Sequence, residues 1–264
     1  MQDIRITIIQ SSLFWESHKE NRKMFSEKIL SIKENTDIIL LPEMFSTGFS
    51  MNPYPIAEDA KGETFQWMLK TSAEKNAVIA GSVATKENGR FYNRFYWVQP
   101  DGNFYQYDKK HLFTFAGEHN NYTAGKNKVI ISYKGWKFLP LICYDLRFPV
   151  WSKNNYSESD GFDYDCLIYV ANWPKPRNHP WKSLLIARAI ENQSYVAGIN
   201  RVGNDANNND YSGDSAIINS RGEYITQLLP DKELIETATL SYSSLYDFRQ
   251  SFRVGNDWDR FEIK

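Results

Sequence analysis

The sequence predicts an α/β fold in which two β-sheets pack face to face and helices cover their outer sides, a four-layer α-β-β-α sandwich. The first observation behind this prediction is a strand-helix-strand unit at the start of the chain, and the second is the return of that order in the second half. The third is a set of hairpins inserted between these units, an arrangement that favours two mixed sheets packed together. With 264 residues, of which 42% are hydrophobic and 24% charged, the chain can bury a large core.

The first half alternates between strand-like and helix-like patterns. Met24, Phe25, Ile29 and Ile32 recur at helical spacing, and the Pro-Asp-Gly-Asn run from position 100 is typical of a hairpin turn. The elements expected here are strands over residues 3–10, 37–41, 77–83, 91–99 and 104–108, and helices over residues 17–33 and 62–75.

The second half repeats the strand-helix-strand order after a further hairpin, whose turn is expected at Lys134-Gly135. A polar insert covers 152–164, and the loop 203–210 is rich in turn-forming residues, so we expect that loop to be exposed and mobile. Residues 243–264 are expected to form an aromatic and charged tail. The elements expected here are strands near 128–133, 136–143, 165–171, 195–201, 213–219, 222–229 and 235–240, and a helix over 180–193.

Composition excludes some classes of partner. The formal net charge is −1, so no basic field is available to attract nucleic acid or an anionic membrane surface.

The first residues alternate like a strand and lack the basic start and long apolar segment of a signal peptide, which predicts a cytoplasmic location. The only cysteines are Cys143 and Cys166, expected to be free thiols there, and Cys166 is expected in a strand core.

Cys143 lies where an apolar run gives way to a polar, charged turn. This places its sulfur at the C-terminal end of a predicted strand, where ligands usually approach an α/β layer. The alternative is a small buried hydrophobe, because free cysteines are often buried. With an ordinary pKa of about 8.5, a nucleophilic thiol needs a base or a cation nearby.

Two further strand ends supply such groups. Glu43 follows an apolar run, and partial burial of its carboxylate would make it a better base, although an exposed loop glutamate fits the pattern too. Lys109, Lys110 and His111 follow the strand 104–108, and an ammonium there could stabilise an oxyanion. A Lys-Lys pair is also typical of a solvated turn.

Together these motifs resemble the nitrilase superfamily of carbon-nitrogen hydrolases, whose members use a Glu-Lys-Cys triad. The matching segments, in the order of the family, are Leu41-Pro42-Glu43, Tyr107-Asp108-Lys109-Lys110-His111-Leu112-Phe113 and Cys143-Tyr144-Asp145-Leu146-Arg147-Phe148-Pro149. The resemblance selects Lys109 over Lys110 and makes Glu118 a candidate for positioning Lys109 or the substrate amide. The alternative for Glu118 is a solvated loop carboxylate.

The resemblance also carries expectations about the whole chain. It covers nearly all residues and implies a single domain, 1–264, with a four-layer sandwich of the nitrilase type and a homodimer associating through outer helices such as 180–193. No cofactor and no metal are expected. Within the family the closest likeness is to bacterial omega-amidases. It implies hydrolysis of the terminal amide of 2-oxoglutaramate or 2-oxosuccinamate through a cysteine thioester, with the Tyr144 backbone N–H as an oxyanion donor.

The substrate carboxylate should meet a cationic or hydroxyl group away from the sulfur. The candidates are Tyr122, Trp173, Arg177 and Arg201, whereas Arg147 is expected to pair with an acid as structural support.

Several alternatives remain open at this level. His111 or His119 could act as the base for Cys143. The chain could hydrolyse an N-carbamoyl compound or another small aliphatic amide, or it could be a non-catalytic binding protein of the same fold. No HExxH motif, paired-cysteine spacing or Gly-rich phosphate loop is present, which argues against metal or nucleotide sites.

Overall fold

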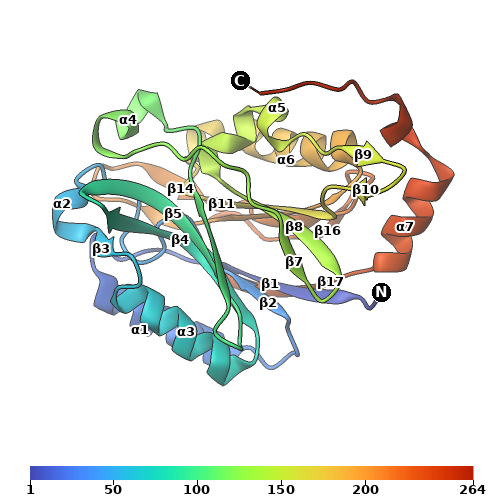
Figure 1. Ribbon diagram of the computed structural model, residues 1–264. Coiled ribbons are helices and arrows are strands. Elements are labelled where there is room, and N and C mark those ends of the chain that lie inside the picture. The colour runs from blue at the N-terminus through green and yellow to red at the C-terminus, as the bar shows by residue number, and fades with distance from the viewer. Residues whose placement is uncertain (264) are drawn as a thin grey trace.

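The computed structural model describes residues 1–263 and contains two mixed sheets that lie face to face between layers of helices (Figure 1). The strand order is β17-β1-β2-β4-β5-β6 in the first sheet, where β3 also pairs with β4, and β16-β15-β12-β11-β8-β7 in the second. Helices α1 and α3 lie outside the first sheet and α6 lies outside the second. The four-layer α-β-β-α prediction is confirmed.

The first sheet consists of β1 (Ile4–Gln10), β2 (Ile38–Leu40), β3 (Glu58–Asp59), β4 (Val78–Glu87), β5 (Arg90–Val98), β6 (Phe104–Asp108) and β17 (Leu234–Leu240). The second consists of β7 (Ile131–Tyr133), β8 (Trp136–Ile142), β11 (Cys166–Ala171), β12 (Tyr195–Asn200), β15 (Ala216–Ile218) and β16 (Tyr224–Gln227). Two small hairpins are β9 (Tyr156–Ser157) with β10 (Gly161–Phe162), and β13 (Val202–Asn204) with β14 (Asp210–Ser212).

The α-helices are α1 (His18–Ser31), α2 (Pro53–Ile56), α3 (Glu63–Lys75), α4 (Glu118–Asn121), α5 (Pro149–Ser152), α6 (Asn178–Asn192) and α7 (Tyr242–Ser251). Single 3₁₀ turns are η1 (Thr114–Ala116), η2 (Cys143–Arg147), η3 (Lys175–Arg177) and η4 (Val254–Asp257). None of the helices found within residues 1–263 is both long and apolar enough to cross a membrane.

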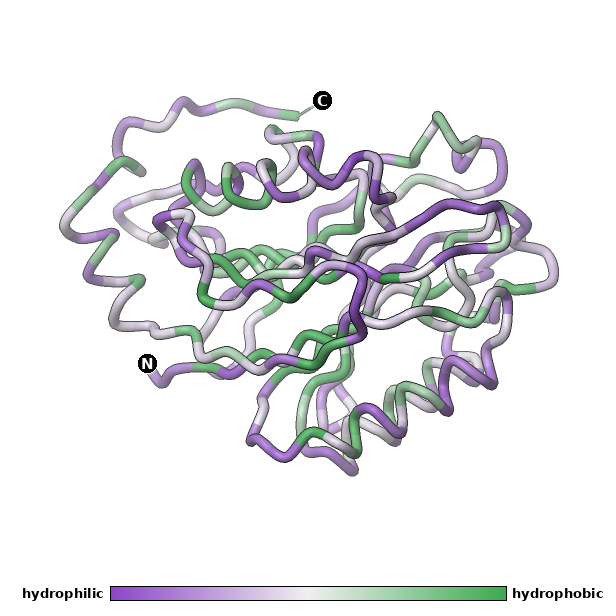
Figure 2. Tube along the Cα trace, turned by 180° about the vertical axis from the view of Figure 1, so that it is seen from behind, coloured by the Kyte–Doolittle hydropathy of each residue, from purple (hydrophilic) through white to green (hydrophobic). Residues whose placement is uncertain are grey.

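Strand alternation divides the apolar side chains between two cores. Ile38 and Leu40 of β2 belong to the core between the sheets, whereas Ile39 points to the opposite face and packs with Phe25 of α1 and Met68 of α3. In Figure 2 the hydrophobic residues accordingly concentrate along the central strands and on the inner sides of the helices. Because both faces of β2 are covered, its sequence is a continuous apolar run.

The C-terminal segment contains a helix that the sequence analysis did not identify. Residues 243–251 of the expected tail lie in α7. Only Leu245 and Arg249 of α7 are buried, which leaves too short an apolar stripe to reveal the helix. Its anchor is a long-range ion pair, in which Arg249 Nη1 lies 2.6 Å from Asp165 Oδ1. Position 264 of the predicted tail lies outside the described residues.

The predicted loop 203–210 is largely exposed, as expected, but it forms most of a hairpin. Val202 pairs with Ser212 and Asn204 with Asp210, and the turn between the strands is bound by the buried Asp205. The single buried polar residue in a run of exposed asparagines carries no periodic signal. This explains why the sequence predicted an unanchored loop.

Glu233, in the turn before β17, is expected to make stability depend on pH. Its carboxylate accepts hydrogen bonds from the Ser12 backbone N–H and hydroxyl and pairs with Lys28. Burial opposes ionisation, but these partners outweigh it and lower the pKa of Glu233 from 4.5 to about 2. A lowered folded-state pKa stabilises the fold above pH 4.5, and this contribution is lost as the pH falls toward 2.

Glu233→Gln should therefore lower the free energy of unfolding at pH 7, and the difference from wild type should shrink as the pH falls through this window. Urea unfolding at several pH values measures it, with the exposed Glu27→Gln as control. A deficit that stayed constant down to pH 2.5 would contradict the assignment.

Candidate active site

Cys143 lies at a sharp turn at the C-terminal end of β8, a strand in the interior of the second sheet. Its φ of +43° is in the left-handed region, which costs a non-glycine residue free energy. The chain passes directly from β8 into η2 at the edge of the sheet, and Cys143 is 9% exposed. The predicted position at a strand end is confirmed.

Asp145 holds this turn in place. Its Oδ2 accepts hydrogen bonds from the Ile142 backbone N–H at 3.0 Å and from the Tyr107 hydroxyl at 2.8 Å. Its Oδ1 accepts the His111 backbone N–H at 3.0 Å and faces His111 Nδ1 at 2.8 Å. A fully buried carboxylate with four partners therefore fastens the Cys143 turn to the segment that follows Lys109.

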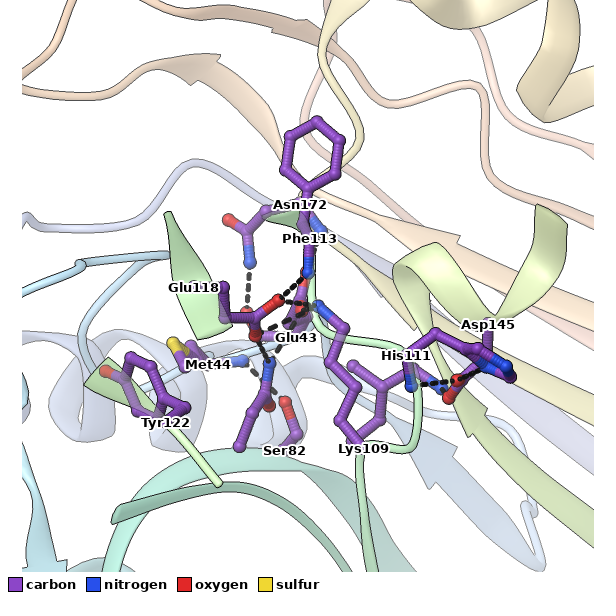
Figure 3. A network of polar contacts seen from close by, with 12 residues as sticks. Glu43, Met44, Ser82, Lys109, His111, Phe113, Glu118, Tyr122, Asp145 and Asn172 are labelled. Carbon is purple, nitrogen blue, oxygen red and sulfur yellow. Dashed lines mark hydrogen bonds and ion pairs between the residues drawn. The ribbon is translucent and has the colours of Figure 1, made fainter. Parts of the chain in front are cut away.

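Lys109 lies between two carboxylates, as Figure 3 shows. Its Nζ is 2.9 Å from Glu43 Oε1 and 2.9 Å from Glu118 Oε2, and all three side chains are completely buried. Glu43 follows β2, Lys109 follows β6 and Glu118 begins α4. Three elements distant in sequence thus meet beside the sulfur.

One ammonium faces two carboxylates in this cluster, and burial, together with the negative charge of Glu43, raises the pKa of Glu118 against the opposing effect of Lys109. Burial alone would lower the pKa of Lys109, but Glu118 and Glu43 outweigh it and raise that pKa, so Lys109 stays charged. Burial, together with the negative charge of Glu43, raises the pKa of the Cys143 thiol well above its usual range, against the opposing effect of Lys109. The resting sulfur is a neutral thiol beside a carboxylate able to accept its proton.

Two asparagines orient the carboxylates. Asn93 Nδ2 donates to Glu43 Oε1 at 2.8 Å and to Glu118 Oε1 at 3.2 Å, and the Asn172 backbone N–H donates to Glu43 Oε2 at 2.8 Å. Asn93 lies within β5. The only feature of the sequence that could have indicated its role is a short polar residue inside a strand that is mainly aromatic. Sequence reasoning missed its role.

Cys143 opens into a cavity of about 130 Å³, which suits a small ligand. Its walls are formed by Phe49, Phe113, Phe115, Ala116, Cys143, Tyr144, Arg147, Asn172, Trp173, Pro174, Arg177, Asn209 and Tyr211. Two guanidinium groups are among them, while no carboxylate of residues 1–263 belongs to the lining. The cavity is therefore apolar with a cationic part.

The predicted binding residues separate into two groups. Trp173 and Arg177 line the cavity, and the Tyr144 residue named as a backbone donor lies there too. Tyr122 and Arg201 do not line the cavity. The Tyr122 hydroxyl donates to the Ser50 carbonyl, and Arg201 is buried behind the cavity wall.

Arg147 departs from its expected structural role. It lines the cavity with its guanidinium 4.8 Å from the centre of the Trp173 ring, and none of the ion pairs found within residues 1–263 includes it. The acid partner predicted for Arg147 is absent from that part of the chain.

The histidines do not meet the sulfur. His111 stacks on Phe148 with ring centres 3.8 Å apart and bonds to Asp145, while His119 is exposed and lies outside the cavity lining. Across residues 1–263, no group of three or more His, Cys, Asp or Glu is arranged to hold a metal ion.

Comparison with known proteins agrees with this geometry. Residues 5–250 match the family model described as carbon-nitrogen hydrolase. The chain is 45% identical to omega-amidase YafV of Yersinia enterocolitica, over 99% of both chains, and 33% identical to 2-oxoglutaramate amidase of Bacillus subtilis, over 96% of both. A crystal structure of XC1258 from Xanthomonas campestris, a CN-hydrolase superfamily protein with an arsenic adduct in the active site, superposes with a TM-score of 0.97 at 39% identity, over 100% of both chains. The chain therefore belongs to the carbon-nitrogen hydrolase family and is an amidase of that family.

Proposed function

We propose that this amidase hydrolyses the terminal amide of a small 2-oxo dicarboxylic acid monoamide, 2-oxoglutaramate or 2-oxosuccinamate, to the dicarboxylate and ammonia. The observation that carries the proposal is the cavity itself, in which Cys143 shares a small apolar space with Arg147 and Arg177, while no carboxylate of residues 1–263 lines it. A substrate that fits must offer an amide at one end and an anionic group at the other. The names of the relatives from Yersinia enterocolitica and Bacillus subtilis point to the same class of amide.

In the first half of the reaction, Glu43 takes the proton of the Cys143 thiol as the sulfur attacks the amide carbon. Lys109 and the backbone N–H of Tyr144 stabilise the oxyanion of the tetrahedral intermediate. The carbon-nitrogen bond then breaks, and Glu43 returns the proton to the leaving nitrogen. Ammonia departs and a thioester on Cys143 remains.

In the second half, Glu43 removes a proton from water, which attacks the thioester carbon. The carbon-sulfur bond breaks, the sulfur recovers its proton, and the dicarboxylate leaves. Lys109 cannot serve as the base, because its raised pKa keeps it protonated. Glu118 shares that ammonium and positions it rather than exchanging protons with the substrate.

The two arginines are suited to the far end of such a substrate. Arg147 follows Cys143 within η2, and its guanidinium lies over the Trp173 ring, 4.8 Å from the ring centre. Arg177 is 5.5 Å from the ring centre of Phe113 and 5.8 Å from that of Phe115. Stacking leaves the edge of a guanidinium available for a carboxylate, so both groups can donate to it.

The test is ammonia release from 2-oxoglutaramate and 2-oxosuccinamate, compared with glutamine, succinamate, propionamide, an N-carbamoyl amino acid and a nitrile. We expect the highest kcat/KM on a 2-oxo monoamide. Arg147→Gln should lower that value by about 10- to 100-fold through KM, because a charge-assisted contact is lost, and should leave propionamide unaffected.

Arg90→Gln, at an exposed position on β5, is the matched control and should behave as wild type. Preference for the N-carbamoyl compound would reject the proposed substrate class while keeping the amidase. An equal loss on propionamide in Arg147→Gln would contradict carboxylate binding by this residue.

A further inference from the structure

The β13–β14 hairpin supplies part of the cavity wall. Tyr211 of β14 and Asn209 of the turn line the same cavity as Cys143, with Tyr211 only 2% exposed and Asn209 at the exposed rim. The Tyr211 hydroxyl donates to Asp205 Oδ2 at 2.9 Å. Because the hydroxyl proton is already hydrogen-bonded to Asp205, Tyr211 contacts a ligand through its aromatic ring and not as a hydrogen-bond donor.

Asp205 binds the whole turn. Its Oδ1 accepts the backbone N–H groups of Asn207 at 2.8 Å and Asn209 at 2.9 Å, and its Oδ2 accepts Asn209 Nδ2 at 2.9 Å as well as the Tyr211 hydroxyl. Burial works against the charge, but these hydrogen bonds outweigh it and lower the pKa of Asp205. The carboxylate therefore holds both wall residues at neutral pH.

Arg201 supports the same ring from another side. Its guanidinium lies 4.7 Å from the centre of the Tyr211 ring, its Nε donates to the Val202 carbonyl at 3.2 Å, and its Nη2 donates to the Asn204 carbonyl at 2.8 Å. This fully buried cation has no carboxylate within ion-pair distance among residues 1–263. The Arg201 guanidinium instead contacts the hairpin backbone and the Tyr211 ring.

We propose that Tyr211 is a specificity-determining residue that limits the length of the acyl chain accepted beside Cys143, and that Asp205 and Arg201 are positioning residues that fix its ring. Asp205 binds the Tyr211 hydroxyl and Arg201 contacts the face of its ring, so the ring cannot move aside for a longer substrate. In a cavity of about 130 Å³ a fixed aromatic wall discriminates by size. The proposal rests on the proposed function in taking Cys143 as the nucleophile.

The first experiment uses three monoamides that differ only in length, 2-oxosuccinamate, 2-oxoglutaramate and 2-oxoadipamate. Tyr211→Ala should raise kcat/KM for the longest relative to the shortest by about tenfold or more, since one methylene in a closed pocket changes kcat/KM by about 10- to 200-fold. Tyr246→Ala, at an exposed position of α7, is the matched control and should keep the wild-type ratio.

The second experiment tests the positioning role with near-isosteric changes that preserve the fold. Tyr211→Phe removes the hydrogen bond between Tyr211 and Asp205, and Asp205→Asn replaces the carboxylate that accepts it together with the bond from Asn209 Nδ2, so both should shift the length preference in the direction of Tyr211→Ala, by a smaller factor. The double variant should shift it no further than Asp205→Asn alone, because the two changes break one interaction. Arg201→Met should produce a comparable shift by removing the support of the ring face.

A third readout does not depend on the substrate class. The rate of Cys143 alkylation by 2-chlorohexanamide, relative to 2-chloroacetamide, should increase in Tyr211→Ala and Asp205→Asn. If wild type hydrolysed none of the 2-oxo monoamides, the proposed function would fail, and this alkylation ratio would still decide the role of Tyr211. An unchanged alkylation ratio with an equal loss of rate on all three monoamides, or additive effects in the double variant, would overturn the proposal.

Discussion

Replacing Cys143 with alanine is expected to reduce amide hydrolysis by at least about 10⁴-fold, the largest effect that we predict. The thiol is the nucleophile of the proposed scheme, and no other thiol, serine or threonine belongs to the cavity lining formed within residues 1–263. Without it the thioester cannot form, although the substrate can still bind. Ammonia release under saturating 2-oxoglutaramate measures the loss, and mass spectrometry of the wild type after rapid acid quench should find the acyl group on Cys143.

Cys166→Ala provides the matched control. Cys166 is also a free thiol in the second sheet, but it lies on β11, is fully buried in the core, and burial raises its pKa too. This variant should retain turnover, apart from the cost of removing a buried sulfur. Undiminished hydrolysis by Cys143→Ala would exclude covalent catalysis through this residue.

Replacing Lys109 with methionine is expected to abolish turnover and to lower the free energy of unfolding by about 3–5 kcal/mol. The stability loss arises because Glu43 and Glu118 would be left buried together without a counter-charge. The activity loss arises because the ammonium that stabilises the oxyanion is removed. Urea unfolding and ammonia release measure the two effects separately.

A second change separates the two roles of Lys109. The double variant Lys109→Met and Glu118→Gln should recover part of the lost stability, because one of the two uncompensated carboxylates becomes a neutral amide. It should not recover turnover. Lys110→Met, whose ammonium lies over the Trp151 ring outside the cluster, should remain active and is the matched control. Recovery of turnover in the double variant would show that Lys109 serves only to hold Glu118.

The fold was predictable because its main elements carry strong local patterns. The apolar run of β2 and the helical spacing of Phe25 and Ile29 in α1 needed no tertiary information. Helix α7 and the β13–β14 hairpin escaped prediction for the opposite reason. Each is bound to the rest of the fold through a buried polar residue, Arg249 in α7 and Asp205 in the hairpin, whose partners are identified only by the folded chain.

The candidate site divides in the same way. Glu43, Lys109 and Cys143 were identifiable because each stands at a strand end within a recognisable motif, and the structure brings all three into one cluster. The roles predicted for Arg147 and Arg201 are exchanged in the structure. Arg147, expected to be structural, lines the cavity, and Arg201, a candidate for substrate binding, lies behind the cavity wall. Sequence spacing gives no information on the side of a turn from which a long side chain emerges.

The layers, the family and the three candidate catalytic residues could be predicted from the sequence, since periodicity and motifs are local properties of the chain. The charges around Lys109, the composition of the cavity wall and the support of Tyr211 became known from the folded chain. These depend on distances between residues far apart in sequence, and the free energy of each contact depends on burial that no local segment can define.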